Sequence, residues 1–135
     1  MQVLSDAGIE ELATLYAGQE FETRATPSVG CEVHNSEDDV SNCGNQWQDV
    51  VITIRSSADK APNETTADDP TALHQALVGS VSDALKTTTL EADLTAVEDD
   101  YTCMIARAKS SDAGVVGRCF FTTLNFRVYA APGKV

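Results

Sequence analysis

Hydrophobic and polar positions along the chain follow two periods, and their order predicts both helices and strands. Apolar residues spaced by three or four predict helices over 6–17 and 70–86, followed by a shorter helix that ends near residue 97. Apolar residues at every second position predict strands. These alternating segments are 27–35, 47–55, 101–109 and 115–131.

The order of these elements is α-β-β-α-(α)-β-β, which is two hairpins joined by a helix. This order predicts an α+β fold: a four-stranded, mainly antiparallel sheet with two or three helices on one face. Residues 1–135 form one predicted domain, with polar loops at 35–46 and 56–69 and a turn at 110–114.

Particular side chains mark where the predicted helices begin. Ser5 or Asp6 is suited to cap the first helix. Asp69 and Pro70 fit the N-cap and first helical position of the second, since proline lacks only an N–H that would be unbonded there. Thr88 and Glu91 have the spacing of a capping box for the third.

Alternation in the last strand divides its side chains between two faces. The face predicted to lie under the helices is apolar and combines Phe120, Leu124, Phe126 and Val128 with Val50, Ile52 and Ile54. The opposite face carries Phe121, Arg127 and Tyr129 and is half apolar. A half-apolar face exposed to water is typical of an interaction surface, so we expect it to meet a neighbouring subunit.

The charge of the chain narrows the classes of partner. The net charge is −12, which argues against a generic nucleic-acid binder and against an anionic membrane surface. Residues 101–135 are the exception, because they hold five of the nine basic residues and one of the 21 acidic ones. These bases either pair with acids of the same chain or attract another copy of it.

Four cysteines leave two interpretations of the redox state. Cys31, Cys43, Cys103 and Cys119 are even in number, as in a small secreted binding module with two disulfides. The N-terminus lacks the basic start and apolar core of a signal peptide, which favours an intracellular start and reduced thiols. Cys103 and Cys119 occupy alternating apolar positions, where cysteine usually acts as a small buried hydrophobic residue.

Residues that could carry catalysis or bind a cofactor form no recognised motif. His34 and His74 are the two histidines, and the sequence has no nucleophile elbow, phosphate-binding loop or zinc-protease motif. The cluster Glu37–Asp39 lacks the alternating spacing of a calcium loop, which favours solvated charge over a metal site. We therefore expect no enzyme, metal or cofactor, with a small acid-dependent enzyme as the alternative.

Residues 71–131 resemble the C-terminal half of small tail-completion and tail-terminator proteins of long-tailed bacteriophages. The helix of that group has the pattern H-x-A-L-V-x-x-V-x-D-A-L, which His74 to Leu85 match. A short helix containing Asp93 and Leu94 follows. The closing pattern G-R-x-x-x-T-T-L-x-x-x-V-Y-x-A-P is matched from Gly117 to Pro132.

The resemblance implies a non-enzymatic virion protein that assembles into a ring, typically a homohexamer. The ring would cap the tail tube, contact the tail tube protein and the head-completion or neck protein, and let DNA pass through its lumen without specific binding. The implied location is the virion, with assembly in the host cytoplasm and no membrane. Another neck or tail-tube ring component is the alternative. The subunit-interface candidates are Glu37, Asp38, Asp39, Arg118, Phe121, Arg127 and Tyr129.

Overall fold

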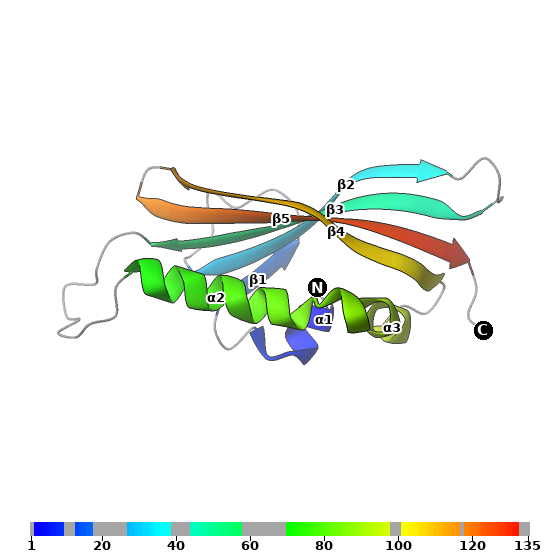
Figure 1. The fold of residues 1–135 in the computed structure, drawn as a ribbon, viewed down its shortest axis with the longest axis horizontal. Coiled ribbons are helices and arrows are strands. Elements are labelled where there is room, and N and C mark those ends of the chain that lie inside the picture. The colour runs from blue at the N-terminus through cyan, green and yellow to red at the C-terminus, as the bar shows by residue number, and fades with distance from the viewer. Residues whose placement is uncertain are drawn as a thin grey trace.

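The computed structural model describes residues 2–9, 13–17, 27–38, 44–57, 70–97, 101–116 and 118–132. They form one sheet with helices on one of its faces, which confirms the predicted α+β class (Figure 1). The elements in chain order are α1 (Gln2–Asp6), β1 (Thr14–Ala17), β2 (Ser28–Asp38), β3 (Gln46–Ser57), α2 (Pro70–Ala84), α3 (Thr87–Val97), β4 (Tyr101–Val116) and β5 (Cys119–Pro132).

The sheet has five strands in the order β1-β2-β3-β5-β4. The β2–β3 and β4–β5 hairpins are antiparallel and meet where β3 pairs with β5, so the two predicted hairpins are confirmed. The fifth strand, β1, is an addition to the predicted four, and it pairs in parallel with the start of β2. Strands β3 and β5 are central, and their side chains therefore have neighbours on both sides.

The N-terminal helix predicted over 6–17 is wrong. Helix α1 ends at Asp6, and Gly8 adopts a φ of +80°, a left-handed conformation that stops a right-handed helix. The chain then enters β1, whose four residues gain hydrogen bonds along β2. A strand pairing between distant segments has overridden the local helical spacing of Ile9 and Ala13, which are both buried.

The turn predicted at 110–114 is also wrong. Strand β4 continues to Val116, and its residues 110–116 pair with 119–125 of β5. Register shifts between Cys103 and Ile105 and between Ala108 and Ser110 insert extra residues into β4. At each bulge the strand kinks locally, and its pairing with β5 then resumes. The polar, glycine-containing residues 110–116 therefore remain paired with β5.

The two longer helices follow the sequence prediction. Helix α2 begins at Pro70, and its buried residues are Pro70, His74, Leu77 and Val81, one stripe at helical spacing. Helix α3 begins at Thr87, one residue before the predicted cap. The Glu91 carboxylate accepts a hydrogen bond from the Ala106 N–H of β4 at 3.2 Å. Asp69 lies outside the described residues.

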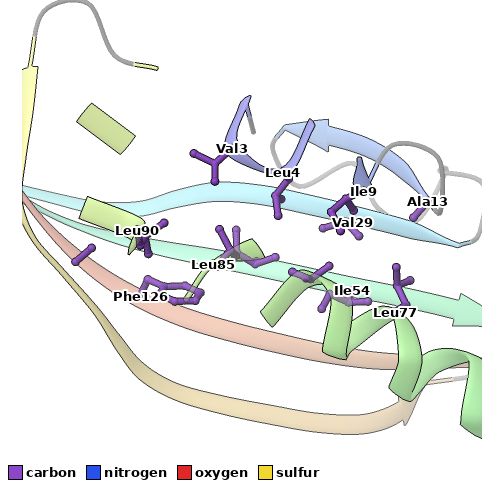
Figure 2. Packing of buried hydrophobic residues seen from close by; sticks show 13 residues of the cluster. Val3, Leu4, Ile9, Ala13, Val29, Ile54, Leu77, Leu85, Leu90 and Phe126 are labelled. Atoms are coloured by element: carbon purple, nitrogen blue, oxygen red, sulfur yellow. The ribbon is translucent and has the colours of Figure 1, made fainter. Parts of the chain in front are cut away.

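The core lies between the helices and one sheet face, as the alternation predicts. Ile54 of β3 and Phe126 of β5 meet Leu77 of α2 and Leu90 of α3, while α1 adds the almost fully buried Leu4 (Figure 2). Each such side chain contributes about 1.5–3 kcal/mol when fully buried. This layer fixes which face of β3 and β5 remains free of helices.

The cysteines of the described segments carry free thiols: Cys31, Cys103 and Cys119. Burial raises the pKa of the Cys31 thiol. Burial also raises the pKa of Cys103, with a further contribution from the negative charge of Glu91. Cys43 and the polar residues 39–43 and 58–69 lie outside the described residues.

Candidate interaction surface

The sheet face turned away from the helices is the candidate functional surface. Ile52, Ile54 and Phe126 point to the helices, so the alternate positions of β3 and β5 lie on the other face. No helix of the described segments covers this face (Figure 1). We call it the helix-free face, and the side chains discussed next lie where β2, β3, β4 and β5 run side by side.

An aromatic pair lies at one end of the helix-free face. Trp47 of β3 and Tyr129 of β5 are cross-strand partners, and their ring centroids lie 4.6 Å apart at 46°. Asn45 donates a hydrogen bond to the Tyr129 hydroxyl at 2.9 Å. Tyr129 is only 7% exposed. Such aromatic pairs stabilise by about 0.5–1.5 kcal/mol beyond area burial.

Arg127 lies next to this pair and is held by two contacts. Its guanidinium carbon is 4.8 Å from the centroid of the Trp47 ring, a cation–π arrangement. Its Nη2 donates to Glu37 Oε2 at 3.5 Å. Its Nε is buried without a hydrogen-bond partner among the described residues. The side chain is therefore oriented by the protein but incompletely bonded.

A polar row crosses three strands at Arg127. Asp49 of β3 is its cross-strand partner on one side, and Arg107 of β4 is its partner on the other. Asp49 Oδ1 is buried without a hydrogen-bond partner in the part of the chain that the structure describes. Arg127 thus has a second arginine as its partner on one adjacent strand and an aspartate as its partner on the other.

Comparison with known proteins gives a structural match and no sequence match. No protein-family model matches the chain, and no curated protein does. The structure is similar to a chain in the virion of a native gene transfer agent particle, with a TM-score of 0.62 over 98% of this chain and 90% of that chain. The chain shares its fold with a virion component. At 19% sequence identity this likeness establishes the fold alone.

The predicted interface residues lie in separate places on the fold. Glu37, Arg127 and Tyr129 gather at the Trp47 end of the sheet. Phe121 is a partner of Arg55 at the other end of β5, about 26 Å away at 3.3 Å per residue. Arg118 is exposed in the turn before β5.

The remaining two predicted interface residues are Asp38 and Asp39. Asp38 ends β2, and Asp39 lies outside the described residues. The acidic cluster of residues 37–39 is therefore represented on the helix-free face by Glu37.

Sequence reasoning missed several residues that complete the surface. The sequence pattern predicts one strand for Trp47 and Asp49 and another for Arg107, but it assigns none of them to the face of Arg127. Their grouping depends on which strands are neighbours and in what register. The available signal was their odd spacing from the buried Ile52 and Ile54, which puts Trp47 and Asp49 on the helix-free side once β3 is known to be central.

A second polar cluster lies on the opposite, helix-covered side. His74 of α2 is within hydrogen-bond distance of Ser56 through Nδ1, at 2.6 Å, and of Thr122 through Nε2, at 2.8 Å. All three residues are at most 8% exposed, and burial lowers the pKa of His74. Both ring nitrogens are thus occupied by hydroxyl groups, so the arrangement joins α2 to β3 and β5.

The described segments contain neither a candidate metal site nor a candidate membrane-spanning helix. No group of three or more His, Cys, Asp or Glu residues within them is placed to hold a metal ion. None of the described helices has the length and apolar character to cross a membrane.

Proposed function

We propose that this chain is a virion structural protein that forms a ring, as a tail terminator or tail-completion subunit. The observation that carries the proposal is the fold shared over nearly the whole length with a chain of a gene transfer agent virion. The resemblance of residues 71–131 to tail terminators supports the same role independently of that comparison.

The helix-free face supplies the surface that such a ring requires. A ring subunit presents one face to a different face of the next copy, so it needs an interaction surface that its own helices leave uncovered. The aromatic pair and Arg127 are enriched residue types at interfaces, and Trp47 holds Arg127 in place before any partner binds. In this proposal the ring caps the tail tube, joins it to the head or neck, and passes DNA without specific binding.

The experiment that tests the role combines assembly with location. Light scattering and negative-stain images of the purified chain, alone and with tail tubes, are expected to reveal rings of several copies. Gold labels on a tagged chain in purified particles are expected at the junction of head and tail. A chain that stays monomeric even with tail tubes present contradicts the proposal.

A second candidate is another ring component of the neck or tail tube. The same structural likeness favours it, because the matched chain is described only as part of a virion. Gold labels distributed along the whole tail would assign the chain to the tube instead of its terminus.

A further inference from the structure

Two arginines are paired across adjacent strands on the helix-free face. Arg107 and Arg127 are directly opposite each other on β4 and β5. Their neighbours Ala106 and Phe126 are buried toward the helices, so both arginines point to the other side. Like charges directly opposite on adjacent strands destabilise a sheet. A chain with nine basic residues therefore places two of them in an unfavourable pair.

The described residues neutralise this pair only in part. Glu37 reaches one nitrogen of Arg127, and both side chains are well exposed, at 65% and 40%, so the ion pair contributes little. Among the described residues, no carboxylate lies within ion-pair distance of Arg107, which is exposed. The Arg127 Nε is unbonded but buried, so the donors available to a partner are those of the exposed Arg107 and of the solvent-exposed part of the Arg127 guanidinium. Guanidinium N–H donors of this pair thus lack acceptors among the described residues. Carboxylates of another subunit would suit them, because a guanidinium binds a carboxylate through two parallel hydrogen bonds.

The charge distribution of the chain favours a second copy of the chain over DNA as the partner of the arginine pair. Carboxylates are plentiful in the rest of the chain, because 20 of its 21 acidic residues precede the β4–β5 region. On the outer side of the helices, Asp83 of α2 is 76% exposed. A DNA backbone is a poorer fit, since two arginines neutralise about two phosphates against a chain of net charge −12.

We propose that the Arg107–Arg127 pair binds carboxylates on the acidic surface of a neighbouring copy of this chain. The inference rests on the ring assembly proposed above and assigns it a specific contact. Trp47 fixes the orientation of Arg127, and Arg107 provides a second guanidinium fork beside it. Together they recognise carboxylates with geometric specificity that a single mobile lysine lacks.

The test measures self-association of the full chain after single substitutions at Arg107. In sedimentation at about 0.1 M salt, Arg107→Glu is expected to raise the dissociation constant at least tenfold, and Arg107→Gln by a smaller factor. Lys86→Glu is the matched control, because it makes the same charge change at an exposed site on the helix side. Because Lys86 pairs with Asp83, one of the carboxylates that a neighbouring copy could offer, this substitution is expected to leave the constant unchanged or to lower it, and not to raise it. Circular dichroism and melting temperatures confirm that each variant folds.

The outcomes separate this inference from the ring proposal. If the wild type and Arg107→Glu assemble into rings equally well, the arginine pair is not the contact, although the ring stands. Equal weakening by Lys86→Glu shows an effect of net charge and overturns the assigned contact. A wild-type chain that remains monomeric under all conditions overturns both. Binding of the wild type to a short DNA duplex, lost in Arg107→Gln, reassigns the pair to a polyanion and also overturns it.

Discussion

At the scale of single residues, His74 is the most consequential polar side chain of the interior. Its two ring nitrogens meet the Ser56 and Thr122 hydroxyls, which come from different strands. Phe120 packs near its ring, with centroids 5.6 Å apart. The histidine therefore specifies how α2 lies on the sheet, because a shift of the helix would leave buried polar groups unbonded.

We expect His74→Ala to lower the free energy of unfolding by about 2–4 kcal/mol. The substitution leaves the Ser56 and Thr122 hydroxyls buried without the imidazole and opens a cavity beside Phe120. Urea unfolding measures the change, with Gln75→Ala, at the exposed neighbouring position, expected within about 0.5 kcal/mol of the wild type. A loss below 1 kcal/mol would show that the cluster does not stabilise the fold.

The same histidine predicts a dependence of stability on pH. Burial lowers the pKa of His74 below its ordinary value of 6.5, so the unfolded chain takes up the proton first as the pH falls. Stability from this group is complete above pH 6.5 and is lost below it, until the folded-state pKa is reached. Unfolding free energies between pH 8 and 5 are expected to fall less steeply in His74→Gln than in the wild type. Parallel curves would contradict the assignment.

At the scale of elements, the N-terminal segment shows how a single glycine can end a helix and change the direction of the chain. The spacing of Ile9 and Ala13 suits a helix, yet the left-handed Gly8 ends α1 and sends the chain into β1. Both apolar residues are buried in the resulting structure. The same spacing of apolar residues is therefore compatible with a turn followed by a strand as well as with a helix.

Two glycine substitutions are expected to have opposite effects. Gly8→Ala should destabilise the protein by about 1–2 kcal/mol, since a φ of +80° is unfavourable for a residue with a Cβ. Gly79→Ala, in the exposed interior of α2, should stabilise it by about 0.5–1 kcal/mol. Neither added Cβ meets an atom within 4 Å, so thermal unfolding compares backbone effects directly. Effects of the same sign would contradict this account of α1.

At the scale of the whole molecule, charge and fold have separate roles. The net charge of −12 makes the compact chain repel itself, while the basic residues of β4 and β5 form a local exception. The strand pairing places two of these basic residues, Arg107 and Arg127, side by side on the helix-free face. The same acidic surface that limits stability is, in our proposal, what a neighbouring copy offers to those arginines.

Added salt is therefore expected to stabilise the folded chain. Raising KCl from about 0.01 to 0.5 M shortens the Debye length from about 30 Å to less than 8 Å and screens the repulsion. We expect a gain of about 1 kcal/mol, or a rise in melting temperature of about 4 °C. Lys86→Glu, which makes the chain more negative, should show a larger rise by calorimetry. A melting temperature that falls with salt would mean that attractive ion pairs dominate.

The sequence by itself determined the α+β class, the two hairpins, α2, and the division of β3 and β5 into an apolar and a mixed face. These follow from periodicity and turn residues, which act over a few positions along the chain. The added strand β1, the continuation of β4 to Val116 and the pairings of Trp47 with Tyr129 and Arg107 with Arg127 were decided only by the tertiary structure. Strand order and register depend on pairing between distant segments and on how the helices cover one face of the sheet. The local spacing of apolar residues determines neither the order nor the register.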